Sequence, residues 1–359
     1  MKNWEANVRK VEPYVPGEQP RGEKIIKLNT NENPYPPSPR AQAALREMDL
    51  DGMRRYPDPE AGILVQAIAD AYGLKKDQVF VGVGSDDVLA MIFLTFFNSS
   101  KPVLFPDITY SFYDVWASML RIPYETVPLR EDFTICPSDY RRENGGVIFP
   151  NPNAPTGEEL PMEAVEDIVR ANPDVIVVVD EAYVDFGAES ALPLIEKYDN
   201  LLVVQTFSKS RGLAGMRIGF ACAQPKLIRY LNNVKYSFNS YTMDQTALVC
   251  GAAAAADKDY FQETVQKVIA TREWTKKELA RLGFVFGDSK ANFIFASHPS
   301  IPARELFSML RDQGIYVRYF QKPRIDNYLR ISIGTQEEME RLTSVLENYL
   351  TAGRQRRKV

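Results

Sequence analysis

Short apolar runs alternate with helix-like stretches along the first two thirds of the chain, and this alternation limits the possible folds more than any other feature. The runs are rich in β-branched residues and end in turn residues, as buried strands do. Helical stretches such as 85–97 and 161–171 lie between several of them. Strands that alternate with helices predict an α/β fold with a largely parallel sheet covered on both faces. The predicted strands are 79–83, 103–105, 147–149, 175–179, 201–204 and 218–221.

The pattern changes after about residue 224. An amphipathic helix is predicted at 257–282, and strand-like segments then alternate with helices that begin at 303 and 337. A chain of 359 residues exceeds the length over which one core usually grows. We therefore predict an amino-terminal arm at 1–30 that belongs to a smaller domain, a large domain at 31–240, and the rest of a small α+β domain at 241–359.

Charge and residue counts exclude several functions. A net charge of −4 argues against a nucleic-acid partner. The chain has a single histidine, His298. A multi-histidine metal site is therefore excluded, as is a Ser-His-Asp triad anywhere else in the chain, and we expect no metal. No apolar stretch approaches the ~20 residues of a membrane span, and the first residues lack the apolar core of a secretory signal. Three scattered cysteines fit a reducing, cytoplasmic location.

The sharpest local signal lies at 206–217, where a predicted buried strand ends in hydroxyls, a lysine, glycines and an arginine. Catalytic groups belong at the carboxyl ends of sheet strands, where loops open into a crevice. Partial burial would make the Lys209 amine available as a nucleophile, and Ser208 and Arg217 suit a phosphate. The alternative is a surface lysine on an exposed loop.

A second signal is Asp180, which ends the apolar run at 175–179. A buried carboxylate needs a positive partner, and the protonated pyridine nitrogen of pyridoxal phosphate would be one. Tyr183 could then donate its hydroxyl to the phenolic oxygen of that ring. Taken alone, an aspartate that caps the next helix is about as good an interpretation.

Two further loops follow predicted strands. The segment 83–87 opens a helix, so the backbone N–H groups of Ser85 and Asp86 could bind an anion, although these residues are also ordinary helix caps. The segment 149–157 contains three prolines and two asparagines, and is either a rigid turn or a wall facing the cofactor ring. Because all four loops follow strands of one parallel sheet, we expect them to converge at one edge.

At these motifs the chain resembles the fold-type I pyridoxal-phosphate aminotransferases, and within them the histidinol-phosphate aminotransferase group. The resemblance extends over nearly the whole length and implies a large domain with a mixed, mostly parallel seven-stranded sheet. The motifs that carry it are Leu-Asn-Thr-Asn-Glu-Asn-Pro at 28–34, Arg-Tyr-Pro at 55–57, Gly-Ser-Asp at 84–86, the Pro-Thr-Gly loop, Asp-Glu-Ala-Tyr at 180–183, Ser-Lys at 208–209 and Leu-Arg-Ile-Ser-Ile-Gly at 329–334.

The resemblance implies a role for each cofactor-binding residue. Lys209 would hold pyridoxal 5′-phosphate as an aldimine and later shuttle a proton, while Asp180 would pair with the ring nitrogen. Tyr183 would bond the phenolic oxygen. In a homodimer, Tyr56 would reach the neighbouring subunit's phosphate. Tyr110 would stack on the ring. The other contacts with the cofactor, chiefly with its phosphate, would come from Ser85, Asp86, Thr206, Ser208 and Arg217.

For the substrate, the resemblance assigns Arg330 to a carboxylate. Tyr14, Asn31 and Arg318 match other substrate-binding positions. The chain departs from the family at Ala154, where an asparagine usually bonds the ring oxygen. Either Asn153 replaces that asparagine through a shifted loop, or Tyr183 bonds the oxygen alone.

The reaction implied is ping-pong amino transfer, with histidinol phosphate as donor and 2-oxoglutarate as acceptor. Three alternatives stay open: decarboxylation of phosphothreonine, amino transfer from aromatic amino acids, and a non-catalytic regulator built on the same fold. The residue types alone decide neither the donor nor the acceptor.

Overall fold

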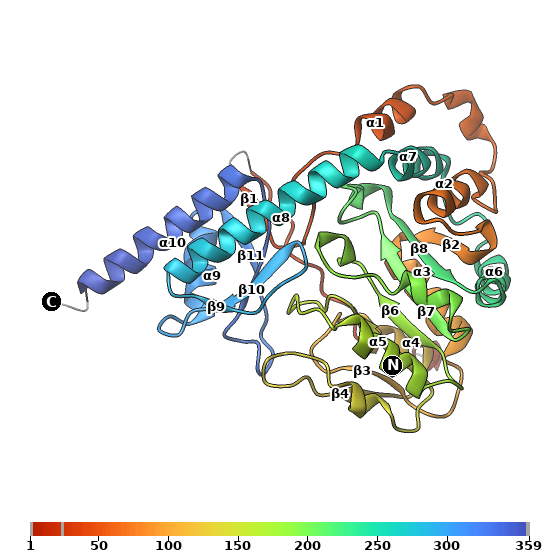
Figure 1. Ribbon diagram of the computed structural model, residues 1–359, viewed down its shortest axis with the longest axis horizontal. Helices are drawn as coiled ribbons and strands as arrows, with labels where there is room; N and C mark the ends of the chain where they lie inside the picture. Colours follow the sequence, from red (N-terminus) through yellow and green to blue (C-terminus); the bar gives the residue numbers. More distant parts are fainter. Residues whose placement is uncertain (1–2, 23–24, 357–359) are drawn as a thin grey trace.

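The computed structural model describes residues 3–22 and 25–356. Within these ranges the strands form two sheets, one of seven strands and one of five. Helix α8 (Lys258–Arg281) runs from the larger sheet's side of the molecule to the smaller sheet's side (Figure 1). Among the described residues, no helix combines the length and the apolarity needed to cross a bilayer.

The larger sheet is mixed but mostly parallel, as predicted. Its order is β2-β8-β7-β6-β5-β3-β4, and β8 runs antiparallel to both of its neighbours. All six strands predicted for this region are present, and β4 is an additional edge strand with a largely exposed pattern that hydrophobicity does not mark. The strands are β2 (Val79–Val83), β3 (Val103–Pro106), β4 (Tyr124–Val127), β5 (Gly146–Pro150), β6 (Val177–Asp180), β7 (Leu201–Thr206) and β8 (Ile218–Ala223).

Helices cover both faces of this sheet, because alternate side chains of each buried strand point to opposite faces. In β6, Val177 and Val179 belong to one apolar core and Val178 to another. The first core contains residues of α1 (Pro39–Arg46), α2 (Gly62–Tyr72), α5 (Met162–Ala171) and α7 (Gln245–Ala256), and the second contains residues of α3 (Gly84–Phe96), α4 (Tyr113–Leu120) and α6 (Pro225–Phe238).

The smaller sheet has the order β1-β11-β12-β10-β9, and its core includes residues of α8, α9 and α10. β1 pairs in parallel with β11, which ties the end of the amino-terminal arm to this sheet. α7 packs into a core of the larger sheet, whereas α8, which follows it, contributes to the core of the smaller sheet. The domain boundary at residue 241 stays a prediction. The elements are β1 (Ile26–Leu28), β9 (Val285–Phe286), β10 (Phe293–Ser297), β11 (Ile315–Tyr319), β12 (Leu329–Ser332), α9 (Ala303–Asp312) and α10 (Gln336–Arg356).

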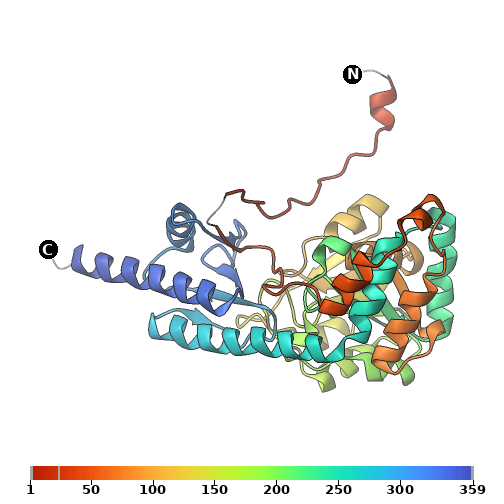
Figure 2. The same cartoon turned by 90° about the horizontal axis from the view of Figure 1, so that it is seen from above.

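Short 3₁₀ helices occur in the arm and in the connections. In Figure 2 the arm leaves the body of the molecule and extends away from it. Tyr14 of the arm stacks on Phe112, with ring centroids 4.2 Å apart. The 3₁₀ helices are Asn3–Asn7, Leu50–Arg54, Lys76–Gln78, Pro137–Tyr140, Val184–Phe186, Leu192–Glu196 and Ala214–Met216.

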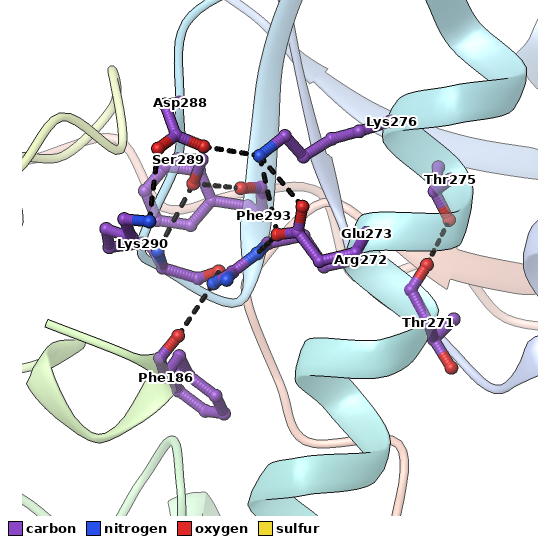
Figure 3. A network of polar contacts seen from close by, with 11 residues as sticks. Phe186, Thr271, Arg272, Glu273, Thr275, Lys276, Asp288, Ser289, Lys290 and Phe293 are labelled. Carbon is purple, nitrogen blue, oxygen red and sulfur yellow. Dashed lines mark hydrogen bonds and ion pairs between the residues drawn. The ribbon is translucent and has the colours of Figure 1, made fainter.

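Arg272, a buried arginine in the middle of α8, joins the two halves of the molecule (Figure 3). Its Nη1 donates to the carbonyl of Phe186 at 2.7 Å, next to the larger sheet, and to that of Ala291 at 3.0 Å, next to the smaller one. Its Nε donates to Glu273 at 2.9 Å. The guanidinium therefore holds two loops against the helix.

We expect Arg272→Met to destabilise the protein, because two buried carbonyls lose their donor. The loss should be about 2–4 kcal/mol of unfolding free energy, given the cost of unsatisfied buried polar groups. Lys277→Met, an exposed position on the same helix, is the matched control. Urea unfolding would measure both, and equal midpoints for the two variants would contradict this role of Arg272.

Candidate active site

One pocket opens where the parallel strands end. It lies between the carboxyl ends of β5, β6 and β7, the start of α3, and residues that follow β1. The convergence of loops expected from the sequence is therefore present. The predicted cofactor residues that line this pocket are Ser85, Asp86, Tyr110, Asp180, Tyr183, Thr206, Ser208, Lys209 and Arg217.

Asp180 ends β6 with its carboxylate buried and only 4% of the residue exposed. Its Oδ2 accepts from the Tyr113 hydroxyl at 2.8 Å, and its Oδ1 accepts from the Ala182 N–H at 3.2 Å. Burial raises the pKa of this carboxyl to about 6, although both hydrogen bonds lower it. Among the described residues no side-chain cation pairs with Asp180, so none of them neutralises its charge.

Tyr113 is a site residue that the sequence analysis did not assign. It lies in the first turn of α4 and is fully buried, 67 positions before Asp180. Burial, together with the nearby carboxylate, raises the pKa of its hydroxyl well above the usual value, which keeps it a donor. No sequence pattern singles it out, and only the packing of α4 on the sheet identifies its partner.

A cradle for an anion lies at the start of α3. Gly84 has φ +83°, and a Cβ there would lie 2.4 Å from an Arg217 nitrogen. A Cβ on Gly219 would lie 2.2 Å from the backbone nitrogen of Ser85. Glycine at these positions lets a guanidinium approach the amino terminus of the 13-residue helix, whose N–H groups and dipole favour a phosphate.

The side chains around this cradle complete it. Arg217 contacts the Ser208 hydroxyl at 3.4 Å and the Asp86 carboxylate at 3.1 Å. The Tyr110 hydroxyl donates to the other oxygen of Asp86 at 2.6 Å. A phosphate at the helix terminus would therefore meet a guanidinium and a hydroxyl whose positions are already fixed.

Lys209 lies between this cradle and a second pocket, and it lines both. Its Nζ donates to the carbonyl of Thr30 at 3.2 Å and lies 5.8 Å from the centre of the Tyr183 ring. The turn that carries it is fixed by Asn33, whose Nδ2 donates to the carbonyls of Lys209 at 2.8 Å and Ser210 at 3.0 Å. The amine is thus presented to the space that both pockets share.

The second pocket brings together all four predicted substrate residues, Tyr14, Asn31, Arg318 and Arg330. Arg330 donates through Nη2 to the carbonyl of Asn29 at 3.0 Å, while its buried Nε has no hydrogen-bond partner among the described residues. Burial, and secondarily the charge of Arg318, lowers the pKa of Arg330. Two guanidiniums in one pocket, one of them with a free donor, suit an anionic group of a substrate.

The loop at 151–157 decides between the two expectations for the missing asparagine. Ala154 lines both pockets. Asn153 turns away: its Nδ2 donates to the carbonyl of Ile108 and to the Thr156 hydroxyl, each at 3.0 Å, and its Oδ1 accepts from Thr109. The loop is not shifted in the way that would bring Asn153 to the ring, so the expectation of a cofactor contact by Asn153 is corrected to a role in holding the loop.

Tyr56 lies outside both pockets of its own chain. It is 80% exposed and stacks on Tyr241, with centroids 4.6 Å apart. Tyr56 therefore does not line the site of its own chain, and its exposed ring is accessible to a second copy of the chain.

Comparisons with known proteins agree with this site. The family model for aminotransferase class I and II matches residues 23–346. The chain is 54% identical to histidinol-phosphate aminotransferase 1 of Pseudomonas fluorescens over 341 residues, covering 95% of this chain and 97% of that protein. It is 51% identical to the histidinol-phosphate aminotransferase of Acinetobacter baylyi over 353 residues, covering 98% of each.

Among solved structures, the histidinol-phosphate aminotransferase of Sinorhizobium meliloti in complex with pyridoxal-5′-phosphate has a TM-score of 0.82, 27% identity and 92% coverage of both chains. The fold and the site therefore define a fold-type I pyridoxal-phosphate-dependent enzyme. The chain belongs to the class I and II aminotransferase family. The predictions of fold, of an aminotransferase and of its cofactor are confirmed.

We expect Tyr113→Phe to raise the pKa of Asp180 above its value of about 6, because the carboxylate loses its strongest donor. Asp180 then takes up a proton at higher pH, and less of it is ionised at neutral pH. Carbon-13 NMR of aspartate-labelled, cofactor-free protein would follow this titration, with Asp180→Asn to assign the signal. Tyr140→Phe, which alters another buried tyrosine, should leave the titration in place. An unchanged Asp180 titration in Tyr113→Phe would contradict the assigned contact.

Proposed function

We propose that this enzyme transfers the amino group of histidinol phosphate to 2-oxoglutarate in a ping-pong cycle. The observation that carries the proposal is the pair Arg318 and Arg330 in the pocket that Lys209 shares. Histidinol phosphate and the dicarboxylic acceptor have little in common except an anionic group near the reacting carbon. The names of relatives at 51–54% identity support the same substrate class.

In this proposal the cofactor, when bound, supplies an electron sink for the charge left at the substrate's Cα. Asp180 would hold a proton on the ring nitrogen. Pairing with that positive charge would lower the cost of burying the carboxylate, and this favours the protonated ring. The α3 terminus, Ser208 and Arg217 bind the phosphate. These contacts fix the ring in one orientation relative to Lys209.

Lys209 is the proposed base. Its Nζ lies at the junction of the two pockets, so it could take a proton from the substrate's Cα and return it to the cofactor's C4′, the carbon joined to Cα through the amino nitrogen. Arg330 and Arg318 orient the substrate so that the Cα–H bond faces this amine. The same arrangement explains why a chain with a single histidine needs no imidazole at its site.

A half-reaction screen tests the substrate. Cofactor-loaded enzyme would receive glutamate, histidinol phosphate, an aromatic amino acid or phosphothreonine one at a time, with absorbance and released carbon dioxide recorded. Glutamate and histidinol phosphate should each convert the bound cofactor to its amine form. Lys209→Ala should lose this conversion by at least 10³-fold, as expected for a lost base and nucleophile. Carbon dioxide from phosphothreonine would replace the proposal with a decarboxylase.

We further propose that the enzyme is a homodimer in which Tyr56 completes the partner's phosphate site. Exposed apolar side chains occur shortly before Tyr56 and shortly before its stacking partner Tyr241: Leu50, Met53 and Phe238 are 69%, 47% and 72% exposed. A patch of this kind is typical of a protein–protein interface. Since Tyr56 does not line its own chain's pocket, a second copy gives its hydroxyl a function.

Mixing two inactive variants tests this arrangement. Lys209→Ala and Tyr56→Ala dimers should each have little activity, but unfolding and refolding them together should restore about one quarter of wild-type activity, because half of the dimers then carry one intact site. No recovery in a mixture that forms mixed dimers would show that Tyr56 serves its own chain.

We also place the enzyme in the cytoplasm. Cys136, Cys222 and Cys250 are all free thiols. Unpaired cysteines of this kind are typical of proteins in a reducing compartment.

A further inference from the structure

The hydroxyl of Tyr183 receives a hydrogen bond from a residue outside the cofactor pocket. Asn31 Nδ2 lies 3.0 Å from the Tyr183 oxygen and donates to it. A phenol has one proton and accepts through its oxygen. With an acceptor position occupied by Asn31, the proton of Tyr183 is free to point elsewhere, and the side chain lines both pockets beside Lys209.

Ser332 sets the orientation of the Asn31 amide. The backbone N–H of Asn31 donates to the Ser332 hydroxyl oxygen at 2.9 Å. That hydroxyl in turn donates its proton to Asn31 Oδ1 at 2.9 Å. The amide oxygen is therefore directed toward Ser332, which turns the amide nitrogen toward Tyr183. In the opposite orientation the amide oxygen would take the proton of Tyr183.

The backbone of Asn31 is fixed as well. The residue is 1% exposed and has φ +56°, a left-handed conformation that asparagine adopts more readily than most residues. Its carbonyl accepts from Asn292 Nδ2 at 3.0 Å. Ser332 ends β12 and Asn292 precedes β10, so the smaller sheet holds Asn31 against a tyrosine of the larger domain.

In the loop after β5, position 154 offers no polar side chain. Ala154 lines both pockets, and the amide of Asn153 is turned away and fully bonded. The side chains at positions 153 and 154 therefore offer no donor to the ring oxygen. Among the described residues assigned to the cofactor, Tyr183 is then the donor for that oxygen, and the direction of its hydroxyl proton matters correspondingly more.

We propose that Asn31, oriented by Ser332, is a positioning residue that directs the Tyr183 proton to the cofactor's phenolic oxygen and so compensates for the amide missing at position 154. The proposal rests on the proposed function only in that pyridoxal phosphate occupies the pocket. Asn31 acts through Tyr183 and stabilises the negative charge of the ring oxygen. This use differs from the substrate contact that the sequence predicts for Asn31, and both can hold for one side chain.

The consequence is a shift in a titration. When the ring oxygen receives the Tyr183 proton, it holds less tightly the proton that it shares with the Lys209 nitrogen. Loss of the Asn31 amide weakens that donation, so the shared proton is retained to higher pH. The absorbance transition of the lysine-bound cofactor should therefore move upward in Asn31→Ala, by about one pH unit or a tenfold change in proton affinity.

The experiment is a pH titration of that absorbance in six loaded proteins, wild type and five variants. Tyr183→Phe should raise the transition at least as far as Asn31→Ala, and the double variant no further than Tyr183→Phe alone. Asn31→Asp, in which a carboxylate accepts the tyrosine proton, should also raise it. Restoring the absent amide with Ala154→Asn in the Asn31→Ala background should bring the transition back down. An unmoved transition in Asn31→Ala, or a shift that simply adds to that of Tyr183→Phe, overturns the proposal.

A second measurement does not require the cofactor. In the cofactor-free protein, melting temperatures of wild type, Asn31→Ala, Tyr183→Phe and the double variant should show strong coupling between the two positions. Additive losses would mean that the contact is absent and would overturn the proposal. Failure of the proposed substrates in the half-reaction screen leaves both readouts intact, so the two hypotheses fail separately.

Discussion

The buried carboxylate of Asp180 is the interaction on which the rest of the site depends. It ends a central strand, and its partners within the chain are a tyrosine hydroxyl and one backbone N–H. A charge in such a place is costly without a cation, which is why its pKa rises to about 6. A protonated ring nitrogen removes that cost. At the end of a central strand of the larger sheet, the carboxylate thus requires a cation that none of the described side chains provides.

Strand direction places the other groups around this carboxylate. β6 and β7 pair in parallel with Asp180 opposite Val204, so the turn after β7 brings Lys209 to the same pocket. β8 runs the other way and begins where its neighbours end, which puts Arg217 and Gly219 at the same edge. Gly219 then allows the backbone of Ser85 to approach closely. One reversed strand therefore supplies both the guanidinium and the room for the phosphate-binding helix terminus.

The smaller sheet completes the site from the opposite side. β12 carries Arg330, whose guanidinium faces the substrate pocket, and Ser332, which orients Asn31. β1 ends just before Asn31 and is held by β11. Arg272 fixes the loop before β10 against the larger half of the molecule. The proposed substrate contacts and the proposed direction of the Tyr183 proton thus depend on the same small group of strands.

The sequence by itself determined the α/β class, the strands of the larger sheet except its exposed edge, and the positions of Lys209 and Asp180. These follow from apolar runs and from polar residues at their ends, both of which are local patterns. The tertiary structure alone decided that Tyr113 binds Asp180, that Asn153 turns away while Ala154 faces the pocket, and that Asn31 meets Ser332 from 301 positions away. The physical reason is that a side chain's partner depends on strand order, register and helix packing, which join residues whose local sequences carry no sign of each other.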